Sequence, residues 1–183
     1  HSGDSACVIP PQSLGRAVNR RIREVTEDIA RALDTVGLLN VQLAVKDEEV
    51  FVLEANPRSS RTVPFVSKAT EVPIAKVAAK VMLGRSLDDI EAAERVPVHA
   101  SVKEVVLPFD RLQGSDPRLG PEMKSTGEVM GTARTFGDAY WKAQAAAFNA
   151  PPSSGTAHVD LAVDGFDAHY AVRAFEDPVD AIV

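Results

Sequence analysis

The sequence predicts an α/β fold of the α+β kind, built mainly from an antiparallel sheet with flanking helices. Apolar residues recur every three or four positions over residues 14–36, which predicts an amphipathic helix. Two short apolar stretches, residues 41–45 and 50–54, flank a polar turn and predict a β-hairpin. Later segments add expected helices near 74–83 and 136–148 and a strand near 102–107.

The composition is that of a soluble globular protein. The chain has 183 residues, of which 45% are hydrophobic and 25% are charged. A net charge of -6 argues against a nucleic-acid binder. We expect no membrane association, because no apolar run is long enough to cross a bilayer and no signal peptide is recognisable. A single cysteine, Cys7, excludes an internal disulfide framework and fits a cytoplasmic protein.

The first helix is expected over residues 14–36. Ser13 is the predicted N-cap, because a serine side chain can accept a hydrogen bond from the first free N–H groups of a helix. Gly37 is the predicted end, because glycine readily adopts the left-handed conformation that closes many helices. The apolar stripe consists of Leu14, Val18, Ile22, Val25, Ile29, Leu33 and Val36.

The hairpin is expected to place polar side chains on one face. Glu54 and Asn56 share a face because the side chains of a strand alternate with period two. A three-residue loop would set Gln42 opposite Glu54 and Asn40 opposite Asn56. The far face is then expected to carry the apolar residues Val41, Leu43, Phe51 and Leu53.

Oxygen donors and cations lie close together where this hairpin ends. Glu54, Asn56 and Gln42 would bring a carboxylate and two amide oxygens to one surface, a set suited to Mg²⁺ or Mn²⁺. Arg58 and Arg61 follow directly and can bind phosphate in bidentate fashion. The combination suggests phosphoryl transfer from a nucleotide. For Gln42 alone, a solvated polar face on an edge hairpin is an equally good interpretation.

Later segments give weaker signals. A helix with the apolar stripe Ile74, Val77, Ala78 and Val81 is expected to stop at Gly84, and Ser86 is expected to cap a short helix after it. Lys103 and Glu104 are interpreted as a strand-edge pair, Gly127 and Gly131 as turn residues, and Cys7 as a small buried filler. Residues 151–183 are expected to be a linker and a tail too short to form a core.

Several stretches, which cover residues 1 to about 150 in order, form a series. They are His1-Ser-Gly-Asp-Ser-Ala, Asn40-Val-Gln-Leu-Ala-Val, Glu54-Ala-Asn-Pro-Arg-Ser-Ser-Arg-Thr-Val-Pro-Phe-Val-Ser-Lys-Ala-Thr, Ile74-Ala-Lys-Val-Ala-Ala-Lys-Val-Met, Ser101-Val-Lys-Glu-Val-Val-Leu-Pro-Phe and Gly120-Pro-Glu-Met-Lys-Ser-Thr-Gly-Glu-Val-Met-Gly. Together they resemble the large subunit of carbamoyl-phosphate synthase, in its second, C-terminal ATP-grasp half. A lone Glu-x-Asn-Pro-Arg would indicate only the ATP-grasp superfamily, whereas the whole series is more specific.

The resemblance implies an ATP-dependent ligase whose step here is the phosphorylation of carbamate to carbamoyl phosphate. Carried over by position, the ligands of Mg²⁺ or Mn²⁺ are Gln42, Glu54 and Asn56. The nucleotide contacts are His1, Ser2, Gln42 and Glu54, and the catalytic arginines facing the transferred group are Arg58 and Arg61. Implied with these are a glutaminase small subunit as partner, an oligomeric parent enzyme, and a place in pyrimidine and arginine biosynthesis.

The chain also departs from the family pattern. Residues 1–150 match only the C-terminal lobe of an ATP-grasp domain, so one wall of the nucleotide cleft is expected to come from residues upstream of His1. Because the chain begins at His1 rather than Met, it is interpreted as a fragment. Residues 151–183 are expected to be a linker and a divergent or truncated tail, and the isolated fragment is expected to be inactive.

Two alternatives stay open at this point. Another ATP-grasp ligase, such as a biotin carboxylase, would share Glu54-Ala-Asn-Pro-Arg, although the following Ser-Ser-Arg-Thr-Val-Pro differs from the Glu-His-bearing continuation expected there. A truncated, inactive protein that keeps the fold as an interaction module is the non-enzymatic alternative.

Overall fold

A computed structural model describes residues 4–112 and 114–150 of the chain. The chain divides into two compact units, one formed by Pro11–Val96 and the other by the residues on either side of that segment. Both contain antiparallel strands and helices, which confirms the predicted α+β class. His1 and Ser2 and the predicted tail of residues 151–183 lie outside the described residues.

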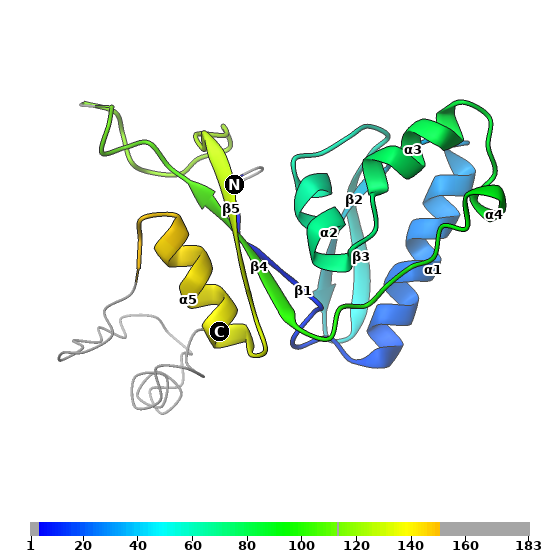
Figure 1. Cartoon of the computed structure of the whole chain (residues 1–183), viewed down its shortest axis with the longest axis horizontal. Helices are drawn as coiled ribbons and strands as arrows, with labels where there is room; N and C mark the ends of the chain where they lie inside the picture. The colour runs from blue at the N-terminus through cyan, green and yellow to red at the C-terminus, as the bar shows by residue number, and fades with distance from the viewer. Residues whose placement is uncertain (1–3, 113, 151–183) are drawn as a thin grey trace. The chain divides into compact units, whose positions relative to one another are not determined.

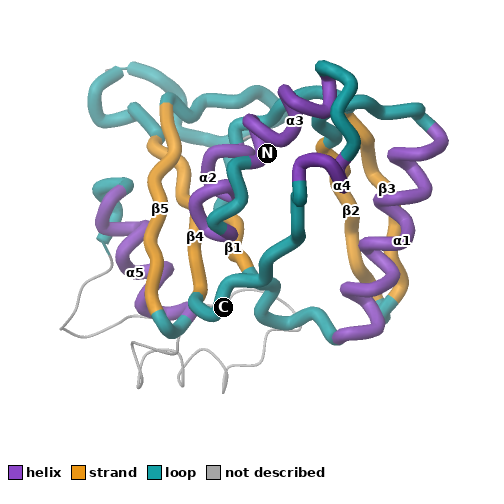
Figure 2. Tube along the Cα trace, turned by 45° about the vertical axis from the view of Figure 1, so that its right-hand side comes forward, coloured by secondary structure: helices purple, strands orange, loops and turns teal. Residues whose placement is uncertain are grey.

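The unit Pro11–Val96 is a two-stranded hairpin with helices around it (Figure 1). Helix α1 packs along strand β3, and the two lie side by side in both ribbon views (Figure 2). Helices α2 and α3 pack against each other. The elements are α1 (Arg16–Ala32), β2 (Asn40–Lys46), β3 (Glu49–Asn56), α2 (Thr62–Thr70), α3 (Ile74–Met82) and α4 (Leu87–Ile90).

Helix α1 is shorter at both ends than its apolar pattern predicted. Its N-cap is Gly15, without a side-chain cap, so the prediction of Ser13 as cap was wrong. Asp34 ends the helix in a left-handed conformation with φ of 48°. The N–H of Thr35 then bonds the carbonyl of Ala30 at 3.0 Å, and that of Asp34 bonds Arg31 at 3.1 Å, which is a Schellman closure. Gly37 is therefore not the stop signal.

The segment after the hairpin forms two helices where one was expected. Residues 62–70 are already helical as α2, with Phe65 and Ala69 buried four positions apart on one face. Helix α3 carries the predicted stripe and ends at Met82, two residues before Gly84, whose φ is 89°. Ser86 caps α4 as predicted, accepting a hydrogen bond from the N–H of Asp89 at 3.0 Å.

The other unit is a three-stranded antiparallel sheet covered on one face by a helix. Its strands are β1 (Cys7–Ile9), β4 (Ala100–Val106) and β5 (Gly127–Ala133), in the order β1-β4-β5, and its helix is α5 (Phe136–Ala146). Helix α5 lies against β4 and β5 (Figure 1). Ala100 and Val102 of β4 pack on Ala139 and Ala143 of α5 to form the core. Because β4 is the central strand, the interpretation of Lys103 and Glu104 as an edge pair was wrong.

Gly131 explains why α5 lies so close to this sheet. A Cβ at Gly131 would stand 2.1 Å from the carbonyl oxygen of Ala139 and 2.5 Å from the amide nitrogen of Ala143. No other residue allows that approach, because glycine alone lacks Cβ. Gly127 and Gly131 thus belong to strand β5, and the prediction that they form turns was wrong.

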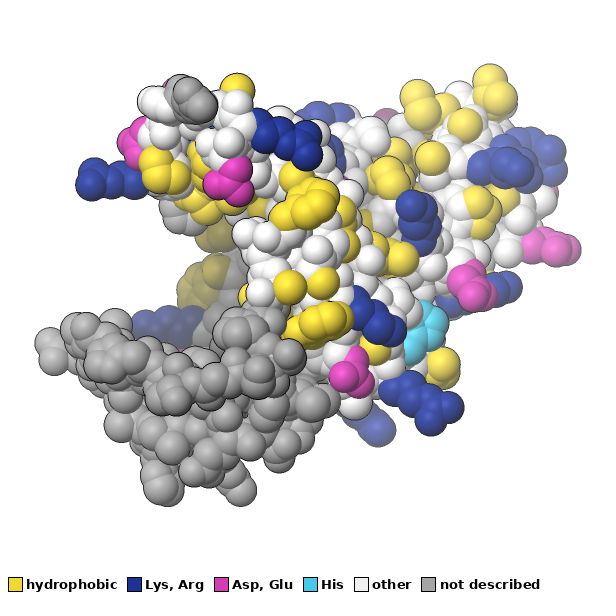
Figure 3. All heavy atoms as spheres, turned by 60° about the vertical axis from the view of Figure 1, so that its left-hand side comes forward, with side chains coloured by type: hydrophobic (Ala, Val, Ile, Leu, Met, Phe, Trp, Pro, Cys, Tyr) yellow, Lys and Arg dark blue, Asp and Glu magenta, His cyan; other side chains and the backbone are white. Residues whose placement is uncertain are grey.

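In the described part of the chain, none of the helices is both long and apolar enough to span a membrane. On the face of the surface shown in Figure 3, basic side chains are interspersed with acidic and apolar ones.

Candidate nucleotide and metal site

The hairpin register brings the predicted oxygen donors together, although through a different turn. Gln42 lies opposite Glu54 and Asn40 lies opposite Asn56, as predicted. Lys46 pairs with Glu49, so the loop has two residues, and both have positive φ, 51° at Asp47 and 63° at Glu48. That is the geometry of a type I′ turn. The expected three-residue loop was therefore wrong.

A β-bulge restores the predicted pairing beyond this shorter turn. Leu43 pairs with Val52, and Leu53 is the extra residue on β3 between the two registers. Phe51 pairs with Ala44 and so shares the face of Gln42, which corrects the prediction that Phe51 lies on the far face. Leu53 has no partner in the ladder, and its exposed fraction is 64%.

Glu54, Asn56 and Gln42 therefore present one surface of oxygen donors. The side-chain amide of Asn56 donates to the Glu54 carboxylate, with Nδ2 and Oε1 at 2.9 Å. Gln42 and Glu54 are exposed and Asn56 is half-buried, so the oxygens are open to a ligand. One carboxylate and two amide carbonyls form a hard donor set of the kind that binds Mg²⁺ or Mn²⁺. No group of three or more His, Cys, Asp and Glu suited to a metal occurs among residues 4–112 and 114–150.

Arg58 and Arg61 follow within five residues of this surface. The N–H of Arg58 bonds the carbonyl of Asn56 at 2.8 Å, which turns the chain sharply after Pro57. Its guanidinium donates from Nη1 to the carbonyl of Ser59 at 2.9 Å. Arg61 is the residue before α2, and both arginines are exposed. The chain thus places two cations directly after the oxygen donors.

The unit formed around β4 contains a buried ion pair and a buried aspartate that the sequence did not predict. Lys103 Nζ lies 3.2 Å from Glu128 Oε1, and their side chains are only 6% and 16% exposed. Cys7 lies opposite Lys103 in the ladder, and burial raises the pKa of its thiol while the charge of Lys103 opposes that rise. Asp4 is also buried, with an exposed fraction of 5%. These contacts join residues that are far apart in the sequence, so the spacing of neighbouring residues could not predict them.

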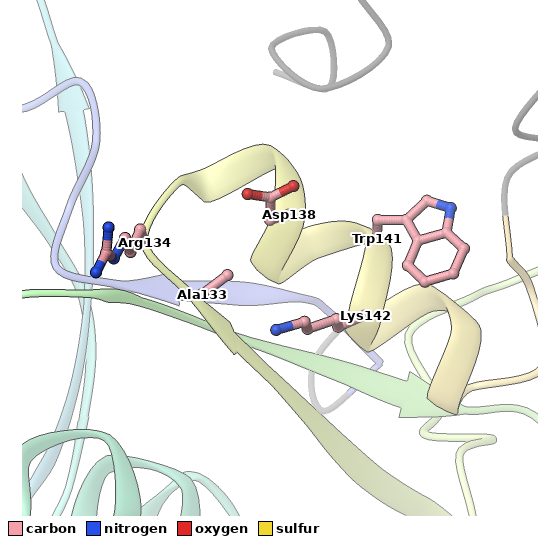
Figure 4. A pocket seen from close by; sticks show the side chains of 5 residues that line it. All are labelled: Ala133, Arg134, Asp138, Trp141 and Lys142. Atoms are coloured by element: carbon pink, nitrogen blue, oxygen red, sulfur yellow. The ribbon is translucent and has the colours of Figure 1, made fainter.

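A shallow hollow of about 410 Å³ lies beside the start of α5 (Figure 4). Its lining contains none of the predicted site residues, and consists of Ala133, Arg134, Asp138, Trp141 and Lys142. The amine of Lys142 donates to the carbonyl of Thr132 at 3.0 Å, so it is engaged with the end of β5.

Comparison with known proteins identifies the family. Residues 1–90 match the family model described as carbamoyl-phosphate synthase L chain, ATP binding domain. The carbamoyl phosphate synthase large chain of Halobacterium salinarum is 71% identical over 182 residues, 100% of this chain. The chain belongs to the carbamoyl-phosphate synthase large-chain family. The homologous large chains of Methanosphaerula palustris and Methanosarcina mazei are 60% and 59% identical over 90% and 88% of this chain.

The chain spans less than a fifth of the length of these relatives, namely 18%, 16% and 15%. The match to the Halobacterium protein spans 182 residues, so the alignment extends into the tail.

Solved structures confirm the predicted ATP-grasp fold. N5-carboxyaminoimidazole ribonucleotide synthetase from Thermus thermophilus has a TM-score of 0.57 at 16% identity, covering 76% of this chain and 40% of that chain. Phosphoribosylglycinamide synthetase from Anaerococcus prevotii has a TM-score of 0.58 at 12% identity, covering 79% and 44%. A biotin carboxylase domain of a single-chain bacterial carboxylase has a TM-score of 0.57 at 16% identity, covering 79% and 39%. At these identities the likeness concerns the fold alone.

Proposed function

We propose that this chain is the C-terminal lobe of the carbamate-phosphorylating half of a carbamoyl-phosphate synthase. The observation that carries the proposal is the common face of Gln42, Glu54 and Asn56, with two arginines directly after it. Membership in the large-chain family supports it, since this family is one of ATP-grasp ligases. The biotin carboxylase alternative is supported only by fold likeness.

The proposed reaction is a single phosphoryl transfer. An oxygen of carbamate attacks the γ-phosphorus of ATP, and the bond from that phosphorus to the oxygen bridging the β-phosphate breaks. ADP leaves with the electron pair, and the new P–O bond completes carbamoyl phosphate. Catalysis of such a transfer depends mainly on positioning and on stabilising charge on the phosphoryl oxygens.

The residues of the chain have distinct proposed roles in that transfer. Gln42, Glu54 and Asn56 would hold Mg²⁺ or Mn²⁺, and their oxygen donors fit such an ion. When bound, the ion neutralises negative charge on the nucleotide phosphates. Arg58 and Arg61 stabilise charge on the transferring group.

The nucleotide contacts complete the proposed site. His1 and Ser2 would contact the nucleotide together with Gln42 and Glu54. Histidine, serine, glutamine and glutamate side chains all carry groups that can form hydrogen bonds with a nucleotide.

The remaining parts of the proposal concern the parent enzyme. Residues 1–150 would form one lobe of the ATP-grasp domain, and the rest of the large chain would supply the opposite wall of the cleft. A glutaminase small subunit would supply nitrogen, and the product would feed pyrimidine and arginine biosynthesis in the cytoplasm. We also propose that the parent enzyme is an oligomer. The isolated chain is expected to be inactive, because half of its cleft lies elsewhere.

The test uses the reverse of the proposed step in the full-length large chain, namely the synthesis of ATP from ADP and carbamoyl phosphate. Glu54→Gln keeps the shape of the side chain but removes its charge. We expect the rate to fall by at least about a hundredfold, because a metal ligand and its charge are weakened. Glu49→Gln, at the opposite end of β3, is the matched control and should keep the wild-type rate. A wild-type rate for Glu54→Gln would refute the assignment of the site.

A further inference from the structure

Large apolar side chains are exposed together where α3 and α4 lie beside the loop that follows α1. They are Leu33, Val36, Met82, Leu83 and Leu87, which we call the apolar patch, and each is more than half exposed. All five belong to the unit Pro11–Val96. Single exposed apolar residues are common on any protein, whereas a group of this kind marks an interaction surface.

Contacts inside the unit show that the apolar patch is continuous. The side chain of Met82 lies over the backbone of Gly37, since a Cβ at Gly37 would stand 3.0 Å from Met82 Cγ and 3.2 Å from its sulfur. Gly37 directly follows Val36, so the loop after α1 meets the end of α3 there. Helix α4, which begins at Leu87, also contacts α3 (Figure 1).

The backbone at the end of α3 is held in one conformation. The N–H of Gly84 bonds the carbonyl of Val81 at 2.9 Å, and the N–H of Arg85 bonds the carbonyl of Lys80 at 3.1 Å. Together they close the helix in a Schellman motif. The apolar patch is therefore formed before any partner binds, which lowers the entropic cost of binding.

The shape and size of the apolar patch argue against a second copy of the chain as its partner. Leu83 projects from the surface, with an exposed fraction of 85%, and a Cβ at the adjacent Gly84 would meet nothing within 4 Å. A two-fold interface sets the same surface of two copies against each other, and a projecting surface is not its own complement. A stable contact between separate proteins also needs roughly 20–30 residues a side, far more than the patch supplies.

We propose that the apolar patch docks another segment of the same large chain, which receives Leu83 in an apolar hollow. The length of the relatives supports this partner, since the chain spans only 18% of the Halobacterium protein. A segment tethered in the same chain has a high effective concentration, so a small contact suffices to hold it. Asp34, Arg85 and Asp88 are exposed beside the patch, so we expect the docked segment to have a polar edge around its apolar centre. No residue of the patch belongs to the proposed metal site, so the inference goes beyond the proposed transfer.

The test is photo-cross-linking of the purified full-length large chain in which Leu83 is replaced by p-benzoylphenylalanine. After irradiation, we expect a cross-linked product with the mass of one large chain on a denaturing gel. Mass spectrometry of its peptides should join residue 83 to a segment outside residues 1–183. The matched control carries the same photoreactive group in place of Arg20, which is exposed on α1 in the same unit, and should not capture that segment.

A product of doubled mass would overturn the inference, because it would show that a second copy covers the apolar patch. So would the absence of any cross-link to residues outside 1–183, because Leu83 would then face water. Capture of the same segment from position 20 would overturn it as well, because the cross-link would not be specific to the patch. If the Leu83 variant does not fold, the same replacement at Leu87 tests the patch, with the same expected product and the same contrary results.

Discussion

Glu54 is the one carboxylate among the three proposed metal ligands, and Asn56 holds it by a hydrogen bond of 2.9 Å. This bond orients the carboxylate before any ligand arrives, which is the usual role of a neighbour in a metal site. Period-two alternation predicted that these two side chains share a face, and the structure agrees. Alternation is a local property of one strand, so a single sequence is enough to predict it.

Lys103 and Glu128 form a largely buried ion pair, with side chains only 6% and 16% exposed. Because both side chains are largely removed from water, loss of one partner leaves the other charge without compensation. Lys103→Met should lower the free energy of unfolding of the 183-residue chain by about 3–5 kcal/mol. The fluorescence of Trp141, the single tryptophan and part of α5 in the same unit, reports the transition during a urea titration.

The matched control for Lys103→Met is Arg21→Met. Arg21 pairs with Glu24 at 3.5 Å, with side chains 59% and 53% exposed, and an exposed pair contributes little. Its substitution should change stability by less than about 1 kcal/mol. Equal effects of the two substitutions would contradict the view that burial makes the Lys103 pair important.

Strand β5 and helix α5 approach each other very closely, since α5 passes directly over Gly131. Gly131→Ala should destabilise the chain by about 1–3 kcal/mol or more, because a Cβ there would meet the backbone of α5 and force the helix away. The same urea titration measures the effect.

Gly127→Ala provides the control within the same strand. A Cβ at Gly127 would meet nothing within 4 Å, so this substitution should be close to neutral. A Gly131→Ala protein as stable as Gly127→Ala would show that α5 does not approach β5 as closely as described.

Some helices and strands were predictable from the sequence, and others were not. The α1 pattern and the hairpin were predicted because helical and strand periodicity are carried by neighbouring residues. The bulge at Leu53 was not, since one extra residue changes the turn length and leaves the apolar pattern almost intact. Strand β5 was missed because its glycines resemble turn residues, and only the packing of α5 explains them.

At the scale of the whole molecule, the described residues form two compact units, and the proposed metal ligands all belong to Pro11–Val96. Asp4, in the other unit, was not predicted, because its partners lie 120 and 121 positions away. The chain spans 18% of its Halobacterium relative, so the complete site can be tested only in a full-length large chain.

A crystal structure of that full-length protein with ADP and Mn²⁺, with the manganese located by anomalous scattering, would test the proposed metal site. We predict a manganese peak bound by oxygens of Gln42, Glu54 and Asn56, at about 2.0–2.3 Å as expected for a small divalent ion, and in contact with the nucleotide phosphates. Manganese bound to the nucleotide by other side chains, with these three left unliganded, would contradict it.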